Sequence, residues 1–294
     1  MAAYSFLKEA KLYLVKGNQQ FLLDISKVSF NQTFTENSYG VKNLHTPEIF
    51  EASVINRANP ANFSFECFAL KEDYNKVVFD SLVDYSTFDL YVETKQDVFK
   101  IENAVLTNGS FTYSRNKPLT ISVSGEAVKV SRVGDYGNYT IPGTPVSKGT
   151  KTYLHPQDNS IVLDGLSISL DTLSVTLELQ NEISWVPYNT VNSAVLNETM
   201  YPTDFVLETR ILAGSIQRYV TGNTDTDLQT YSTSSSLRIK LGQNIGGTFY
   251  GFDFNIGTCS YTNRLNTGSV FTQNYDWRMT DNTTLSNIIT YTTT

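Results

Sequence analysis

Runs of alternating apolar and polar residues recur along the chain and constrain its fold more than any other feature. The run Leu173–Gln180 (LSVTLELQ) is the cleanest, and shorter runs stand at Phe63–Cys67, Leu119–Ser124, Leu237–Leu241 and Phe252–Ile256. Successive side chains of a β-strand point to opposite faces, so each run would place one face on a core and the other on water or a partner. The sequence therefore predicts a mainly β protein.

One segment has helical periodicity instead. From Lys71 to about Asp84, Tyr74, Val77 and Leu82 recur at helical spacing, with charged residues between them. This spacing gathers the apolar side chains on one side of a helix. We expect a short helix packed on a sheet.

A cluster of breaker residues divides the chain near its middle. The segment 131–160 contains Gly134, Gly137, Gly143, Gly149, Pro142, Pro145 and Pro156. Such clusters are typical of linkers, and a chain of 294 residues is long enough for two domains. We predict one domain at 1–130, a linker at 131–160 and a second domain at 161–294. The linker could span about 80 Å if most of it were extended at about 3.3 Å per residue.

The two halves look like weak copies of each other. The corresponding segments are Leu23–Phe34 with Leu173–Trp185, Phe63–Leu70 with Phe205–Leu212, Phe88–Val92 with Leu237–Leu241, and Leu119–Ser124 with Val270–Tyr275. Self-similarity at a fixed spacing is typical of a duplicated unit. Coincidence is the alternative, since the identity is low. The counterpart of the helix is degraded, because Thr221–Ser236 is rich in Thr, Ser and Asp.

Each half carries a long segment between its early strands, at about 31–62 and 181–204. Both segments contain large apolar residues, and those we select as contacts between subunits are Phe34, Tyr39, Leu44, Ile49, Phe50, Trp185, Tyr188, Met200 and Tyr201. Long loops inside compact domains are generally functional, and exposed apolar patches mark protein–protein contacts. The alternative is that both segments fold back over their own core as ordinary hairpins.

Charge and cysteine content narrow the setting. A net charge of −7 makes a DNA-gripping surface improbable, because neutralising phosphates requires Lys and Arg. The same charge suits a wall that DNA slides past, or simply a soluble acidic protein. Cys67 and Cys259 lie in different strand-like runs, and we interpret them as buried free thiols in a protein that folds in a reducing cytoplasm.

No motif for catalysis, a cofactor or a metal is present. His45 and His155 each stand in a loop without a Cys or His partner nearby, and Gly242–Gly247 is better explained as a hairpin turn than as a phosphate loop. Carboxylates can meet in space, so a glycosidase pair stays open, although Trp185 and Trp277 are few for a carbohydrate cleft. We see no secretory signal and no apolar run long enough to span a bilayer. The expected protein is not an enzyme and has no cofactor.

Several of these segments together resemble the major tail tube proteins of long-tailed bacteriophages. The resemblance lies in the strand–helix–strand region Phe63–Val92, the closing hairpin from Ser110 to Gly125, and the second long loop with its return strand, from Asn181 through Met200-Tyr201-Pro202 to Gln217. It covers most of the chain outside the linker. Members of this family carry mostly one tube domain, whereas this chain carries two.

The resemblance implies two tandem β-sandwich or barrel domains, each with a long loop and a flanking short helix. It implies homotrimeric rings of pseudo-sixfold symmetry, stacked into a tail tube through which genomic DNA passes without specific binding. Partners would be further copies and other tail proteins, such as a tape measure, a terminator and possibly a sheath, in a virion assembled in the bacterial cytoplasm. Glu66 and Glu208 are our candidates for the lumen, from matching strands of the two halves.

Three other functions remain open. The chain could be another virion ring or fibre protein, for tail completion or capsid decoration. It could be a carbohydrate-binding β-sandwich, which would act as a stable monomer. An enzyme would need a carboxylate pair whose change abolishes hydrolysis.

Overall fold

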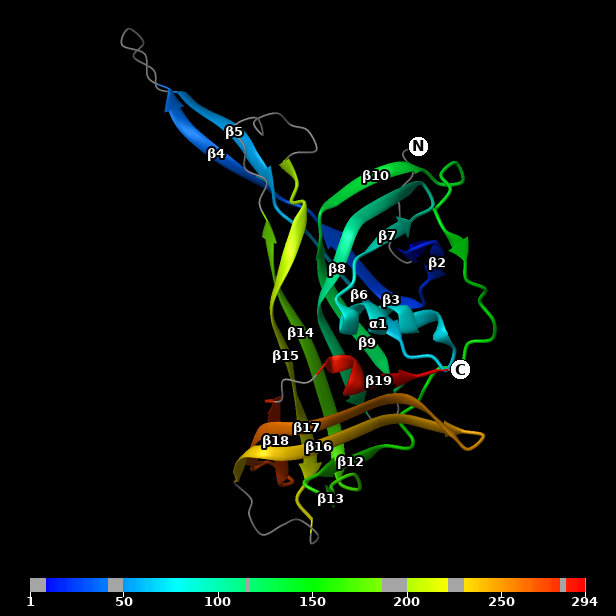
Figure 1. Cartoon of the computed structure of the whole chain (residues 1–294), viewed down its shortest axis with the longest axis vertical. Helices are drawn as coiled ribbons and strands as arrows, with labels where there is room; N and C mark the ends of the chain where they lie inside the picture. Colours follow the sequence, from blue (N-terminus) through cyan, green and yellow to red (C-terminus); the bar gives the residue numbers. More distant parts are fainter. Residues whose placement is uncertain are drawn as a thin grey trace.

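The computed structural model describes residues 9–41, 50–114, 117–186, 200–221, 230–280 and 284–293, without the side chains of residues 37, 39–41, 50–56 and 114. It is mainly β, with one short α-helix, α1, at Lys76–Asp84 (Figure 1). A turn of 3-10 helix at Asp73–Asn75 leads into α1. The helix predicted for Lys71–Asp84 is therefore confirmed.

The alternating runs Phe63–Cys67 and Leu119–Ser124 fall in two strands of the first half, and the structure has further strands beside them. The strands of this half are β1 Lys11–Lys16, β2 Gln19–Leu22, β3 Ile25–Asn31, β4 Phe34–Val41, β5 Phe50–Ala58, β6 Ala61–Phe68, β7 Phe88–Glu93, β8 Asp97–Ser114, β9 Thr120–Ala127 and β10 Lys129–Asp135. Antiparallel pairing links them in the order β3, β6, β9, β8, β7, β1, β2. In β9, core-facing Ile121, Val123 and Ala127 alternate with less buried polar residues, as the period of two predicts.

The second half repeats this order of pairing. Its strands are β12 Ser160–Leu163, β13 Leu166–Ser167, β14 Thr172–Val186, β15 Asp204–Tyr219, β16 Tyr231–Ile245, β17 Thr248–Asn266, β18 Thr272–Met279 and β19 Ile289–Thr292. Antiparallel pairing links them in the order β14, β15, β18, β17, β16, β12, β13, and β19 adds to β17. These paired strands therefore follow the same order in both halves.

The second half lacks a counterpart of α1 among its described residues. Its helical turn there is the 3-10 segment Leu285–Asn287, close to the C-terminus. Residues 222–229, which fall between β15 and β16 as α1 falls between β6 and β7, lie outside the described residues. The strand-like segment predicted at Val270–Tyr275 also begins later in the structure, because β18 starts at Thr272.

A seam of backbone pairing joins the halves into one sheet. The last part of β8 pairs antiparallel with β14, from Ser114 opposite Ser174 to Asn108 opposite Gln180. Figure 1 shows β8 and β14 side by side at the centre of the molecule. A single hydrogen-bonded strand order, β3, β6, β9, β8, β14, β15, β18, β17, therefore crosses from one half to the other.

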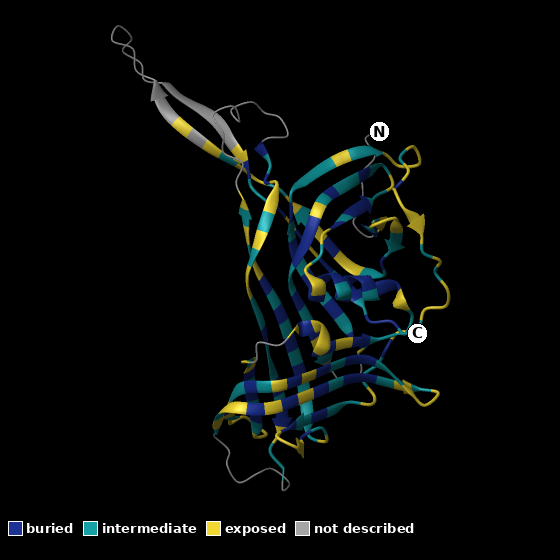
Figure 2. Ribbon diagram, in the orientation of Figure 1, coloured by how far each residue is buried: buried dark blue, intermediate teal, exposed yellow. Residues whose placement is uncertain are grey.

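Helix α1 is buried between the halves. Phe79 of α1 contacts Phe111 of β8 at a ring-centroid distance of 5.8 Å, and Phe252 of β17 and Tyr291 of β19 at 5.8 and 5.6 Å. Gly109 on β8 makes room for the helix, since a methyl group there would lie 2.1 Å from Leu82 Cδ2. One apolar core therefore serves both halves (Figure 2).

The C-terminal strand is fastened to the first half as well. The Tyr291 hydroxyl accepts a hydrogen bond from the Leu70 amide at 2.7 Å and donates one to the Leu70 carbonyl at 2.5 Å. Both residues are buried. The last strand thus satisfies backbone groups that lie 221 positions earlier in the chain.

The predicted linker packs along the first half before it enters the second. Its start forms the end of β10, which pairs with β8, and Thr144–Pro145 forms β11, which pairs with β2. Further on, Lys151 Nζ lies 2.7 Å from Asp24 Oδ1, and the Tyr153 hydroxyl donates to Asp24 Oδ2 at 2.9 Å. The segment therefore connects the halves along a defined path.

Both cysteines are free and fully buried, as the sequence predicted. Burial raises the pKa of Cys67, and it raises the pKa of Cys259 to about 11. A raised pKa keeps a thiol protonated, so at pH 8 only about one Cys259 in a thousand would carry the reactive thiolate. We expect no rapid reaction of the native protein with a disulfide reagent at pH 8, and two thiols per chain in denaturant. Rapid labelling of one thiol in the native protein would contradict this burial.

Candidate functional site

The continuous strand order presents a face of polar side chains opposite the core. Because side chains alternate along a strand, the residues between the buried ones share this second face. We call it the polar face, and it includes Ser29, Asn31, Asn62, Ser64, Glu66, Ser110, Thr112, Ser122, Ser124, Glu126, Thr176, Glu178, Gln180, Ser215, Gln217, Thr262, Arg264, Asn274 and Asp276. It runs unbroken across the seam, where Thr112 lies opposite Thr176 and Ser110 opposite Glu178.

Hydroxyl and amide groups dominate the polar face, and most of its charges are acidic. Glu66 accepts a hydrogen bond from Ser26 at 2.7 Å and lies 3.7 Å from Lys27 Nζ, while Asp276 pairs with Arg264. Lys27, Arg264 and Arg278 are the bases of this face, and they stand among four acids, Glu66, Glu126, Glu178 and Asp276. This mixture is not a row of unpaired bases that would neutralise a run of phosphates. Such a face is suited to contact with water.

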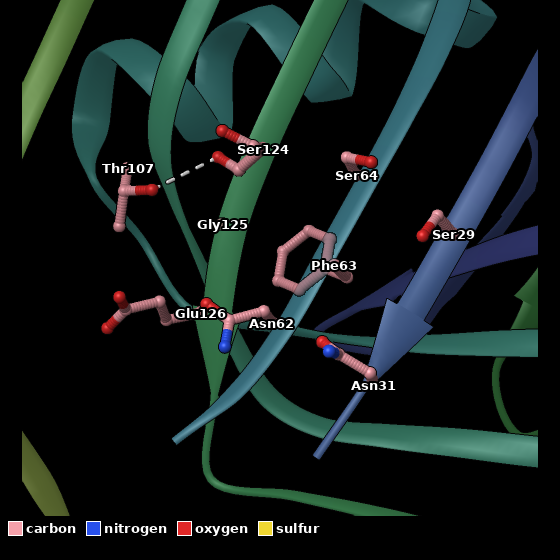
Figure 3. Close-up of a pocket in the computed structure, with 9 residues that line it drawn as sticks. All are labelled: Ser29, Asn31, Asn62, Phe63, Ser64, Thr107, Ser124, Gly125 and Glu126. Atoms are coloured by element: carbon pink, nitrogen blue, oxygen red, sulfur yellow. Dashed lines mark hydrogen bonds between the residues drawn. The ribbon is translucent and has the colours of Figure 1, made fainter. Parts of the chain in front are cut away.

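A shallow hollow of about 250 Å³ marks the first half of the polar face (Figure 3). It is lined by Ser29, Asn31, Asn62, Phe63, Ser64, Thr107, Ser124, Gly125 and Glu126. The Thr107 hydroxyl donates to the Ser124 carbonyl at 3.3 Å, so part of this polarity is used within the sheet. The hollow brings together neutral hydroxyls and amides and a single carboxylate, a set that offers neither a nucleophile with its base nor a cluster of metal ligands.

The first long segment is a hairpin arm. Strands β4 and β5 pair only with each other in the described structure and project away from the body (Figure 1). Of the contact residues predicted here, Phe34 lies in β4 and is 47% exposed. The side chains of Tyr39 and Phe50, and all of Leu44 and Ile49, lie outside the described residues. An exposed phenyl ring at the base of a projecting arm suits a contact with another chain.

The second long segment extends the β14–β15 pair beyond the body. The Trp185 indole donates a hydrogen bond to Glu126 of β9 at 2.6 Å, and its ring lies 5.4 Å from that of Phe205. Met200 is buried within the chain, and the ring of Tyr201 lies 4.8 Å from Lys129 Nζ. Tyr188 lies outside the described residues. Trp185 and Tyr201 therefore already have partners in their own chain, which orient this second arm.

The two lumen candidates differ in position. Glu66 belongs to the polar face, where it pairs across the sheet with Lys27 and Ser122. Glu208 stands at an irregularity of β15, exposed, and accepts a hydrogen bond from Ser184. By position in the pairing order, the counterpart of Glu66 is Gln217, which lies between Ser174 and Asn274. Of the two candidates, only Glu66 lies on the continuous face.

A buried polar cluster that the sequence analysis missed holds the helix to the seam. Asn181 of β14 donates through Nδ2 to the carbonyls of Leu82 and Leu106, both at 3.0 Å. Arg210 of β15 donates to Asn181 Oδ1 at 2.8 Å and to the Val83 carbonyl at 2.6 Å. Burial lowers the pKa of Arg210. The available signal was Asn181 itself, a polar residue at the next core-facing position after Leu177 and Leu179.

The described part of the chain shows how the residues considered for metals and phosphates are placed. Among those residues, no group of three or more His, Cys, Asp or Glu could hold a metal ion. The glycine-rich stretch forms the turn between β16 and β17, where Gly246 and Gly247 adopt positive φ angles of 62° and 87° that favour glycine. No described helix is long and apolar enough to cross a membrane.

Comparison with models of known families identifies the group to which the chain belongs. The model of the Bacteriophage Baseplate Tube Protein Family matches residues 70–294, which is most of the chain. The chain belongs to this family. No curated protein sequence gave a significant match.

The match begins just after β6 and includes α1, the seam and the whole second half. A baseplate tube protein is a structural component of the phage virion. The phage tail relationship predicted from the sequence is therefore confirmed, and its place is refined from the major tail tube family to the baseplate tube family.

Proposed function

We propose that this baseplate tube protein polymerises into stacked rings that form a conduit for phage DNA. Each chain supplies two tandem tube units, at 1–130 and 161–294, joined by the segment 131–160. Three chains then make a ring with six similar units. This proposal extends the family assignment to a definite assembly.

One observation carries the proposal: the order of strand pairing occurs twice, and the two copies are joined edge to edge. Free strand edges recruit other chains because their N–H and C=O groups lack partners. The seam between β8 and β14 satisfies such edges inside one chain. Repeating this arrangement around an axis would close a ring, and stacking rings head to tail would give a filament.

The polar face supports the choice of a lumen wall. Its side chains are mainly hydroxyls and amides, with more acids than bases, and the whole chain has a net charge of −7. Like charge prevents DNA from adhering to the wall, so that the genome can slide. We place Glu66, Glu126 and Glu178 on the lumen side. The role is structural and needs neither a cofactor nor a catalytic residue.

The partners follow from this placement. Copies of the same chain are the main partners, and other tail or baseplate proteins, including a tape measure, a terminator and possibly a sheath, would contact the ends and outside of the tube. Assembly would take place in the cytoplasm of the bacterial host, where free thiols such as Cys67 and Cys259 persist.

Electron microscopy of the purified chain tests the proposal. Hollow filaments or stacked rings with three chains per ring are expected. Single rings that never stack would favour a tail-completion or decoration protein. A stable monomer that binds glycans would favour the carbohydrate-binding alternative, and either result would overturn the tube.

The arms provide a more specific test of stacking. We expect the double change Trp185→Ser and Tyr188→Ser to abolish stacked tubes while rings still form, because the second arm loses its aromatic surface and the hydrogen bond that orients it. Negative-stain microscopy and sedimentation would measure the tubes. Tyr136→Ser with Phe271→Ser is the matched control, because both residues are exposed aromatics outside the arms. Normal tubes from the first variant would exclude this arm from stacking.

A further inference from the structure

The continuous sheet ends at two strands, β3 and β17, and part of the outer edge of each has no partner among the described strands. Strand β3 is paired in register with β6 and with no other described strand. On β17, pairing with β16 reaches Thr262, and the Asn263 amide donates to the Thr230 carbonyl at 2.8 Å. From Arg264 to Asn266, the described pairing of β17 is with β18 alone. Each end therefore offers a short stretch of backbone that has no partner among the described residues.

The repeat identifies these two ends as counterparts of the strands that form the seam. In pairing order, β3 corresponds to β14, and β17 corresponds to β8. The free edge of β17 also lies on the correct side: β14 joins β8 on the side of β7, and β16, the counterpart of β7, lines the same side of β17. The seam is therefore a template for how the two ends would meet.

Irregularities in the pairing establish the correspondence residue by residue. The β3–β6 ladder shifts between Ile25 and Lys27, and the β14–β15 ladder shifts between Thr172 and Ser174. Aligning these bulges matches Lys27–Asn31 with Ser174–Glu178, so that the core-facing Val28 and Phe30 fall on Val175 and Leu177.

The same alignment carries through to the other strand of the seam. In the first half, Ile25 at the bulge pairs with Cys67, and Cys67 pairs with Ile121 on the next strand. In the second half, Thr172 at the bulge pairs with Arg218, and Arg218 pairs with Gln273. The partners of those two residues are Phe111 and Leu265. Phe111 thus corresponds to Leu265, and the seam pair Leu177–Phe111 translates into Phe30–Leu265.

We propose that β3 of one chain pairs antiparallel with residues Arg264–Gly268 of a second copy, with Phe30 opposite Leu265 and Asn31 opposite Arg264. This inference rests on the ring assembly proposed above and specifies its contact. The pairing ends where both free edges end: the β3 ladder stops at Asn31, and β17 is already paired up to Asn263.

The side chains at these edges fit the proposed register. Phe30 and Leu265 are only partly buried in the single chain, whereas their seam counterparts Leu177 and Phe111 are 0% and 1% exposed. Joining the ends would cover both apolar side chains, at roughly 25 cal/mol per Å² of buried apolar surface. On the polar face, Ser29 would meet Asn266 and Asn31 would meet Arg264, so no like charges stand opposite each other.

Engineered disulfides in the full-length chain test the register. Asn31→Cys with Arg264→Cys places one thiol at each end of every chain, and directly opposed residues of paired strands lie within disulfide range. Mild oxidation of the assembled rings should give covalent dimers and trimers, and a reductant should return them to single chains. Ser29→Cys with Asn266→Cys is a second opposed pair, should the first variant fold poorly. The native thiols are buried and should not contribute.

Lys27→Cys with Arg264→Cys is the matched control, because a displacement of four residues separates the thiols by roughly 13 Å. It should remain a single chain after oxidation. Rings in the micrographs without cross-linking of either opposed pair, or with equal cross-linking of the control, would overturn the register and leave the ring proposal intact. The absence of rings would overturn the proposed function and this contact with it.

Discussion

Phe111→Ala should lower the free energy of unfolding by about 3–5 kcal/mol, the largest loss we expect from any single change. Phe111 is 1% exposed, and its ring lies within 5.0–5.8 Å of the rings of Phe79, Phe252 and Phe254. The change would leave a cavity where α1, the first half and the second half meet. Urea unfolding, followed by circular dichroism, measures the loss.

Tryptophan fluorescence adds a direct test of the shared core. Both tryptophans, Trp185 and Trp277, belong to the second half, whereas Phe111 belongs to the first. We expect the fluorescence and dichroism midpoints to fall together in Phe111→Ala. A fluorescence midpoint that stays in place would mean that the halves unfold independently. Phe271→Ala is the control, since Phe271 is 53% exposed, and it should change stability by less than about 0.5 kcal/mol.

Arg210→Ala should cost about 2–3 kcal/mol of unfolding free energy. The guanidinium donates to the Val83 carbonyl and to Asn181 Oδ1, and it lies 5.3 Å from the ring of Tyr85, which ends the helix. Removing it takes the donor away from the Val83 carbonyl of α1 and from Asn181 Oδ1, and unsatisfied buried acceptors are costly. Chemical denaturation of the variant measures the cost.

Arg238→Ala is the matched control for that change. Arg238 is half-exposed. After its removal, Asp253 would still have a second ion-pair partner, because Lys240 Nζ lies 3.5 Å from Asp253 Oδ2. Surface ion pairs contribute little, so we expect less than about 1 kcal/mol. Equal losses in the two variants would show that Arg210 does not fasten the helix. A double-mutant cycle of Arg210 with Asn181 should give a coupling energy, because the two side chains share one network.

The strands and the helix could be predicted because their signals are local. The alternation in Leu173–Gln180 and the helical spacing from Tyr74 to Leu82 depend only on neighbouring residues, and both elements formed where expected. The candidate site could be predicted from the sequence only in part. Sequence similarity matched Glu66 with Glu208, whereas the ladders match Glu66 with Gln217, because the alignment depends on bulges that have no sequence signature.

The sequence by itself predicted a mainly β protein with a short helix and two buried free thiols, since each property follows from composition or from the order of nearby residues. It also indicated two similar halves, and the role of the long apolar segments as contacts between subunits stays a prediction. The tertiary structure decided that the halves share one core, that β8 joins β14, and that β3 and β17 are left as ends. Those outcomes depend on which distant strands meet. The pairing energy of a ladder is set by backbone groups that every sequence carries, so the choice among partners emerges only when the whole chain is packed.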